Sequence, residues 1–201
     1  MSSYKKIPEL KNYLAEYKKL KREVARKRTK INSLFEKYSF VEEIVSTNIG
    51  DFELEDSIRK LFLDLNFSAT KPDTKRDVDV HAKYKRIEFR IEVKNSLNVP
   101  ENEMFQAIKY TNRETNIADI LRPIIIWNNA KSNQEYDDYR ITDAKRNNYG
   151  ILTTKELLKG YLKVKNSDIN VDQFVELLQQ PGLIKYSNSM IKKVKSGDDS
   201  V

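Results

Sequence analysis

Side chains that could hold a metal ion occur together within Arg76–Asn95, which the sequence predicts to be two strands joined by a short polar turn near Lys83–Lys85. Successive side chains of a strand point to opposite faces of a sheet. If the two strands pair, the ends of their polar faces bring Asp79, Glu92 and Lys94 together. Two carboxylates beside an ammonium group suit a hard divalent cation such as Mg²⁺, which prefers oxygen ligands and usually keeps several waters.

The same stretch also has a simpler interpretation. The second predicted strand alternates apolar with charged side chains, in the order Ile87, Glu88, Phe89, Arg90, Ile91, Glu92, Val93 and Lys94. Alternating charge on a strand is most often a solvated outer face of a sheet. On this interpretation the charges keep one face of the sheet in water and carry no chemistry.

Composition narrows the classes of function. With 201 residues and a net charge of +7, the chain is long enough for one sizeable core with an appendage, and its basic balance favours a polyanionic partner. The absence of cysteine excludes disulfides, thiolate metal sites and a cysteine nucleophile. A single histidine, His81, excludes a multi-histidine zinc site within one chain. No apolar run approaches the roughly 20 residues of a membrane span, so we expect a cytoplasmic protein with no membrane partner.

A long helix is predicted over Pro8–Thr47, because proline is tolerated in a first helical turn and neither glycine nor proline follows before Gly50. Lys21 and Arg28 interrupt its apolar residues, which otherwise approximate a heptad repeat: Leu10, Leu14, Tyr17, Val24, Ile31, Phe35 and Tyr38. The interruption argues against a long two-stranded coiled coil.

The same predicted helix is strongly basic. Its candidate nucleic-acid contacts are Lys18, Lys19, Arg22 and Arg26. The helix is therefore a basic arm that contacts phosphates, a helix through which two chains dimerise, or a solvated helix packed against the rest of the domain. The sequence leaves these three interpretations open.

Glycine, proline and polar clusters predict the order of the remaining elements. Before the central pair of strands, a helix runs from Gly50 to a stop at Asn66–Phe67, and Ser68–Lys75 is a strand or loop. After the pair, the predicted elements are a helix over Glu101–Ile117, a buried strand over Arg122–Trp127, a polar loop over Asn128–Asp138, a strand over Tyr149–Leu152, a helix capped by Thr154, and two short helices over Val171–Leu178 and Leu183–Val194. These boundaries divide the chain into a basic helical arm (1–48), a central domain (49–165) and a helical extension with a disordered tail (166–201).

Asp79 between two valines, followed after a turn by Glu92–Lys94, resembles the motif of the PD-(D/E)XK nuclease superfamily, and the pattern is most similar to its Mrr-like branch. Val78 stands where the motif's proline would be. The resemblance spans about Gly50–Leu162 and identifies residues 49–165 as a nuclease-like domain. It implies an α/β fold, a restriction-endonuclease-like core with a central mixed β-sheet flanked by helices, to which this chain adds an N-terminal helical arm and a C-terminal helical extension.

The chemistry implied by the resemblance is Mg²⁺-dependent hydrolysis of DNA phosphodiester bonds, with Mn²⁺ able to substitute. Asp79, Glu92 and the main-chain carbonyl of Val93 would hold the ion. Lys94 would orient the attacking water and stabilise the developing negative charge.

Other predicted site positions have open alternatives. Superfamily members often carry a glutamate on the helix before the metal-binding strands; Glu55 is the catalytic candidate and Glu53 the alternative, although either could simply complement the positive end of the helix dipole. Asp77 competes with Asp79 or adds a ligand. Gln106 lies in a Gln-x-x-x-Tyr pattern similar to that of RecB-like exonucleases, where it could reach substrate.

Three functions fit the resemblance. The first is an endonuclease, perhaps of the restriction or genome-defence kind, in which cutting both DNA strands needs a homodimer or a partner subunit. The second is a RecB-like exonuclease, which needs free DNA ends. The third is a non-catalytic DNA-binding or assembly subunit that keeps the nuclease fold, and the complete set of Asp79, Glu92 and Lys94 argues against it.

Overall fold

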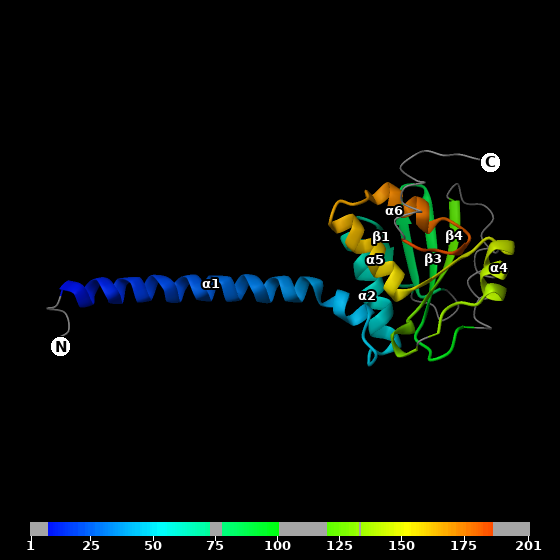
Figure 1. Cartoon of the computed structure of the whole chain (residues 1–201). Coiled ribbons are helices and arrows are strands. Elements are labelled where there is room, and N and C mark those ends of the chain that lie inside the picture. Colours follow the sequence, from blue (N-terminus) through cyan, green and yellow to red (C-terminus); the bar gives the residue numbers. More distant parts are fainter. Residues whose placement is uncertain (1–7, 73–77, 101–119, 133, 187–201) are drawn as a thin grey trace. The chain divides into compact units, whose positions relative to one another are not determined.

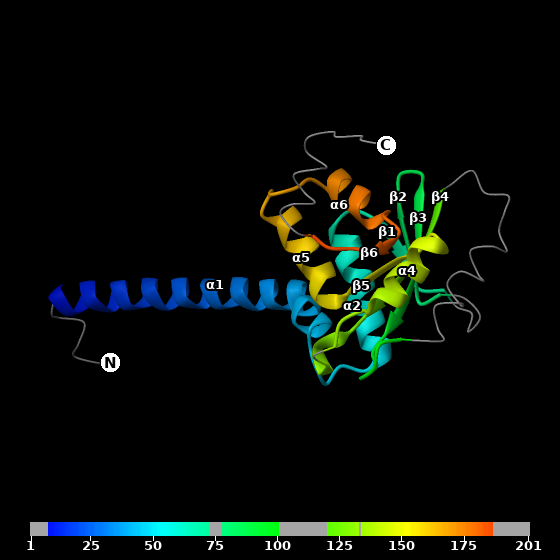
Figure 2. The same cartoon turned by 45° about the vertical axis from the view of Figure 1, so that its right-hand side comes forward.

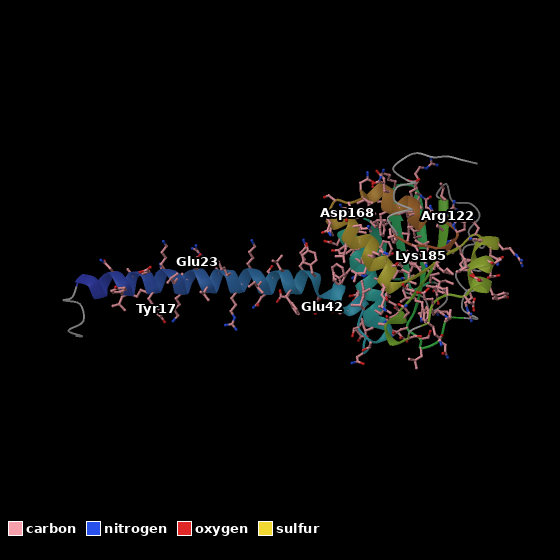
Figure 3. All side chains as sticks on the ribbon, in the orientation of Figure 1. Tyr17, Glu23, Glu42, Arg122, Asp168 and Lys185 are labelled. Atoms are coloured by element: carbon pink, nitrogen blue, oxygen red, sulfur yellow. The ribbon has the colours of Figure 1, made fainter. Side chains whose placement is uncertain are left out.

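The computed structural model describes residues 8–72, 78–100, 120–132 and 134–186 (Figure 1). The chain divides into two compact units, Met1–Ser39 and Phe40–Val201, and each is described by itself. Helix α1 runs over Pro8–Ile44, which confirms the long N-terminal helix predicted from the sequence. Within the first unit its side chains from Asn12 to Lys37 are exposed, and they project from the helix on all sides (Figure 3).

The second unit is built on a six-stranded mixed sheet whose spatial order is the chain order, β1-β2-β3-β4-β5-β6. The first three strands pair antiparallel, and the pairs from β3 to β6 are parallel. This sheet and its flanking helices confirm the predicted α/β architecture. The strands are β1 (Ser68–Thr70), β2 (Val80–Tyr84), β3 (Ile87–Lys94), β4 (Ile120–Trp127), β5 (Gly150–Thr153) and β6 (Gly182–Leu183).

Helices cover both faces of this sheet. Three of them, α2, α5 and α6, lie on one side, and α4 lies on the other (Figures 1 and 2). Aromatic rings join the first side to the sheet: Phe62 of α2 meets Phe67 at 5.1 Å between ring centroids, and Phe67 meets Phe89 of β3 at 6.2 Å. The helices are α2 (Asp51–Asp64), α4 (Asp138–Arg146), α5 (Thr154–Lys165) and α6 (Val171–Leu178), with a short 3₁₀ helix η2 (Asn129–Lys131).

The face under α4 changes character from strand to strand. Glu92 of β3 aligns with Ile125 of β4, and Ile125 aligns with Ile151 of β5. This face is therefore charged on β3 and apolar on β4 and β5, where Ala144 of α4 packs in one cluster with Ile125, Trp127, Tyr136, Tyr149 and Ile151. Because α4 packs on the apolar half, the charged half of the face is available for chemistry.

Two turns use residues with positive φ. Asn66 (φ 64°) ends α2 at the predicted stop, and asparagine tolerates this left-handed conformation better than most residues. Lys85 (φ 55°) turns β2 into β3. The predicted turn is wrong by about two residues, because Lys83 and Tyr84 still belong to β2.

Three sequence predictions for the C-terminal half are corrected by the structure. Helix α4 begins at the end of the predicted polar loop and has no predicted counterpart, because its face contributes only Ala144 to the core. Thr153, not Thr154, caps α5, since its side-chain oxygen accepts the Glu156 N–H. The helix predicted from Leu183 is wrong at its start, because Gly182–Leu183 is strand β6; residues 187–194 of that prediction lie outside the described residues, as does the helix predicted over Glu101–Ile117.

The segment that follows β6 is part of the core. Tyr186 is fully buried, its ring stacks on Phe174 of α6 at 5.1 Å, and its main-chain N–H donates to the Glu156 carboxylate at 2.9 Å. Gly160 of α5 lies directly beneath the ring: a Cβ there would be 2.7 Å from three Tyr186 ring carbons. A glycine in mid-helix is explained by this close approach.

Gly160→Val should therefore lower the free energy of unfolding by about 1–3 kcal/mol through overpacking against Tyr186, despite the better helix propensity of valine. Urea or thermal denaturation of the full chain measures the change. The matched variant Lys159→Val, at an exposed position of the same helix, should change it by less than about 0.5 kcal/mol. Equal effects of the two valines would contradict the role assigned to the Gly160–Tyr186 contact.

Candidate active site

Asp79 lies in the bend directly before β2, and its half-buried carboxylate reaches the neighbouring strand. Its Oδ2 accepts a hydrogen bond of 2.7 Å from the main-chain N–H of Val93. Val80 pairs with Ile91, so the next residue back along β2 comes beside Glu92. The antiparallel register of two strands thus joins a carboxylate to a motif 14 residues later in the chain.

Glu92 and Lys94 stand two residues apart on β3 and therefore project from the same face. Lys94 Nζ lies 2.7 Å from Glu92 Oε1. Both side chains are largely buried, with 6% of Glu92 and 17% of Lys94 exposed. An ion pair with so little water around it is held in one geometry, unlike a pair of surface charges.

Burial raises the pKa of Asp79 to about 7, and repulsion from Glu92 and Glu55 adds to the rise. The Val93 N–H and the charge of Lys94 act in the opposite direction but do not outweigh it. The structure therefore brings together carboxylates that repel one another in a site where little water screens them. A strongly raised carboxylate pKa of this kind is typical of functional sites.

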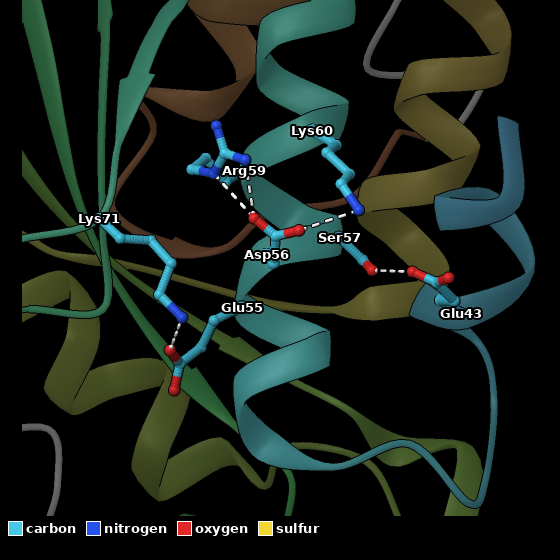
Figure 4. A network of polar contacts seen from close by, with 7 residues as sticks. All are labelled: Glu43, Glu55, Asp56, Ser57, Arg59, Lys60 and Lys71. Carbon is cyan, nitrogen blue, oxygen red and sulfur yellow. Dashed lines mark hydrogen bonds and ion pairs between the residues drawn. The ribbon is translucent and has the colours of Figure 1, made fainter. Parts of the chain in front are cut away.

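Glu55 of α2 forms an ion pair with Lys71, whose Nζ lies 2.5 Å from Glu55 Oε2 (Figure 4). Lys71 follows β1 and also lies over the Phe52 ring, 3.6 Å from its centroid. Glu55 is close enough to Asp79 to affect its pKa, whereas the alternative Glu53 is exposed on the first turn of α2. The sequence analysis missed Lys71, because nothing in Thr70–Pro72 distinguishes it from a surface lysine.

The other polar contacts of α2 stabilise the helix and lie outside the candidate site (Figure 4). Asp56 pairs with Arg59 at 2.7 Å and with Lys60 at 2.9 Å. Burial alone would raise the pKa of Asp56, but its hydrogen bonds with Lys60 and Arg59 lower it overall. Ser57 donates a hydrogen bond to Glu43, near the end of α1.

Two asparagines brace the ends of β3 and β4. Asn128 is fully buried, and its side-chain amide donates to Asn95 Oδ1 at 3.0 Å and to the Ser46 carbonyl at 3.2 Å. Asn95 in turn donates to the Ile49 carbonyl at 2.8 Å. The network ties the end of β3, one residue after Lys94, to the loop that precedes α2. Sequence analysis assigned these asparagines no role; their positions at the ends of predicted strands were the only available signal.

The remaining charges of β3 are also buried. Arg90 Nε donates to Glu88 Oε1 at 3.2 Å, and His81 Nδ1 lies 3.8 Å from the same oxygen. Arg90 and Glu92 are each only 4% exposed, which rules out the interpretation of this strand face as a solvated surface. His81 occupies the structural role expected for a lone histidine on this face.

Several predicted positions are placed away from this cluster or are not described. Asp77 and Gln106 lie outside the described residues. On α1, the four candidate nucleic-acid contacts are exposed and line one shallow hollow together with Ala15 and Glu23: Lys18, Lys19, Arg22 and Arg26. In the described part of the chain, no helix is long and apolar enough to cross a membrane.

The donor set fits a hard divalent cation. Asp79 and Glu92 offer carboxylate oxygens whose mutual repulsion a cation would relieve, and Val93 between them in the motif offers a main-chain carbonyl. Within the described ranges, no group of three or more His, Asp and Glu side chains gathers as ligands. An ion with so few protein ligands keeps several waters, as Mg²⁺ does in most of its protein sites.

Comparison with known proteins identifies the fold. No family model and no curated protein matches the chain. The restriction endonuclease FokI bound to DNA is similar in structure, with a TM-score of 0.57, 13% sequence identity and coverage of 75% of this chain and 30% of FokI. A second FokI structure gives a TM-score of 0.55 at 13% identity, over 73% and 30% of the two chains. The chain has the restriction-endonuclease-like fold.

This result confirms the predicted resemblance at the level of the fold. The chain spans about 30% of the length of FokI. The small subunit R.BspD6I2 of the heterodimeric restriction endonuclease R.BspD6I is also similar, with a TM-score of 0.40, 13% identity and coverage of 81% of this chain and 98% of the subunit.

Asp79→Asn should raise the thermal stability of the protein at pH 8 in EDTA. The folded pKa of Asp79 is about 7 against an ordinary value of 3.8; the unfolded chain therefore loses this proton first, and ionised Asp79 destabilises the fold increasingly from pH about 4 to 7 and fully above it. Asparagine keeps the acceptor for Val93 without the charge. We expect a gain of about 0.5–2 kcal/mol, measured by thermal denaturation.

Asp56→Asn is the matched control, because Lys60 and Arg59 stabilise that carboxylate; it should leave the melting temperature unchanged or lower it. Mg²⁺ should raise the melting temperature of the wild type, since a ligand that binds only the folded state stabilises it, and should do so far less for Asp79→Asn. A melting temperature of Asp79→Asn below that of the wild type at pH 8 would contradict the assigned repulsion.

Proposed function

We propose that this chain is a metal-dependent DNA endonuclease that hydrolyses phosphodiester bonds. The observation that carries the proposal is the meeting of Asp79, the Val93 N–H and the Glu92–Lys94 ion pair at the junction of β2 and β3, in a restriction-endonuclease-like fold. FokI, which shares the fold, is a restriction endonuclease and has been seen bound to DNA. The net charge of +7 suits the same polyanionic substrate.

Each residue of the site has a proposed role. Asp79, Glu92 and the Val93 carbonyl hold Mg²⁺, for which Mn²⁺ can substitute. The bound ion lowers the pKa of a water and offsets the negative charge of the transition state. Lys94 is held by Glu92 beside the reacting phosphate, where its ammonium group orients the water and stabilises developing charge. Glu55, positioned by Lys71, accepts a hydrogen bond from a water at the site.

The biological role we propose is cleavage of cytoplasmic DNA in restriction or genome defence. One active site cuts one strand, so cleavage of a duplex requires two copies of this chain or a partner subunit. An exonuclease is distinguished from this proposal by closed circular DNA, which offers no ends. A binding or assembly subunit is distinguished by salt-sensitive DNA binding without cleavage of any substrate.

Asp79→Ala and Lys94→Ala should each lower the rate of plasmid nicking in Mg²⁺ by at least about 10²–10³-fold, because each removes a group that acts on the transition state. The assay compares wild type and variants on supercoiled plasmid and then on linear duplex. DNA affinity and the circular dichroism spectrum should be retained.

Lys60→Ala is the control for a lysine change, since Lys60 pairs with Asp56 on the other side of α2 from the site (Figure 4), and it should nick at the wild-type rate. Full activity of both Asp79→Ala and Lys94→Ala would end the proposal. Digestion of linear DNA alone would establish an exonuclease, and binding without cleavage would establish a subunit of the third kind.

Replacing all four basic residues of the α1 hollow by alanine should weaken DNA binding without changing the chemistry: Lys18, Lys19, Arg22 and Arg26. Each lost phosphate contact reduces the slope of log K against log salt by about 0.9, so the slope should fall by up to about 3–4. Fluorescence anisotropy at several salt concentrations measures the slope. An unchanged slope would show that α1 makes no phosphate contacts.

A further inference from the structure

Helix α1 displays large apolar side chains to solvent throughout the first unit. Tyr17, Val24 and Ile31 are 61%, 64% and 63% exposed. A helix that buries no apolar face is not stabilised by packing, and isolated helices owe little stability to propensity alone. Scattered apolar residues would need no explanation, but these recur at fixed spacing.

The spacing is a heptad repeat with one polar interruption. Tyr17, Val24, Ile31 and Tyr38 are separated by seven residues and occupy the a positions. Counting three residues on from each a position, and back to the start of the repeat, gives the d positions: Tyr13, Leu20, Lys27 and Leu34. The alternative seam through Leu14 and Phe35 meets Lys21 and Arg28, whereas this one meets only Lys27. Sustained a and d heptads are the signature of a coiled coil.

The residue types specify how many strands pair. Val24 and Ile31 are β-branched and stand at a, while Leu20 and Leu34 stand at d. β-Branched residues at a with leucine at d favour parallel two-stranded coiled coils. A single buried polar residue such as Lys27 lowers the stability of the pair but fixes its register.

Charges beside the seam specify the orientation. In a parallel pair each g position meets the next e position of the partner helix, which matches Glu16 with Lys21 and Glu23 with Arg28. An antiparallel pair would instead bring e positions together, and Lys21 and Arg28 would repel each other. The Glu23 side chain is exposed, with only a 3.8 Å contact to Lys27 of its own helix, so it can reach a second chain.

We propose that residues Tyr13–Tyr38 of α1 form a parallel, in-register, two-stranded coiled coil with a second copy of this chain. The basic hollow of Lys18, Lys19, Arg22 and Arg26 falls at positions b, c and f, which face away from the seam. One helix can therefore dimerise and still present its basic side chains to phosphates. Parallel pairing also makes both chains leave the coiled coil at the same end, so two nuclease units are tethered together.

Orientation can be tested by disulfide formation, because the chain contains no cysteine. Tyr17→Cys in the full chain should form a covalent dimer on mild oxidation, since equivalent a positions face each other only in a parallel pair. Arg22→Cys, at the outward f position, is the matched control and should remain mostly monomeric under non-reducing electrophoresis. Equal crosslinking of the two variants would overturn the proposal.

Sedimentation equilibrium, without DNA or metal, tests the seam independently of any nuclease activity. The wild type should be a dimer, and Val24→Glu should weaken it by about 30-fold or more, as expected for a central interface residue. Ala25→Glu, one residue away at an outward b position, should leave the dimer intact, and Lys27→Leu should tighten it by about tenfold.

Helix content measured by circular dichroism separates a lost dimer from a lost fold, because the second unit keeps its spectrum when only the coiled coil dissociates. A monomeric wild type at concentrations of about 100 µM, or weakening by Ala25→Glu as large as that by Val24→Glu, would overturn the proposal. A wild-type dimer that does not cleave DNA would leave the coiled coil standing and refute only the proposed function.

Discussion

The candidate site depends on the register of β2 against β3. Val80 pairs with Ile91, and only in this alignment does the residue before Val80 reach the Val93 N–H. A slip by one residue would turn every side chain of a strand to the opposite face. The apolar residues on the face of Phe89 and Ile91 oppose such a slip, because they are fully buried. Hydrophobic burial on one face thus fixes the polar geometry of the other.

The polar face carries a cost that the rest of the unit has to offset. Asp79 sits near Glu92 and Glu55, and its pKa rises as a result. A sequence selected only for stability would replace at least one of these carboxylates. The braces around the site are extensive: the Asn95–Asn128 network holds the end of β3, and Trp127 Nε1 donates to the Ser96 carbonyl just beyond it. Strain of this kind, surrounded by strong support, is expected of a functional site.

Much of the architecture could be predicted from local signals. Alternation gave β3, the apolar run gave β4, and the expected grouping of Asp79, Glu92 and Lys94 follows from two strands and one turn. Other features had no local signal. Helix α4 buries little of its surface, so its periodicity is weak, and β6 is a two-residue strand that exists because β5 offers an unpaired edge. Lys71 could not be found because its partner Glu55 lies on another element. Contacts of this kind depend on tertiary structure and leave no trace in spacing.

The charge balance of the site explains why two lysines accompany three carboxylates. Lys94 pairs with Glu92, and Lys71 pairs with Glu55, which leaves the charge of Asp79 uncompensated within this group. A site with one net negative charge repels a phosphodiester, and the raised pKa of Asp79 is the response of the protein alone to that excess. A divalent cation would reverse the sign and leave one net positive charge, which attracts the substrate. On the proposed function, the lysines set the site one charge short of neutrality, so that binding of the ion and attraction of DNA become the same electrostatic event.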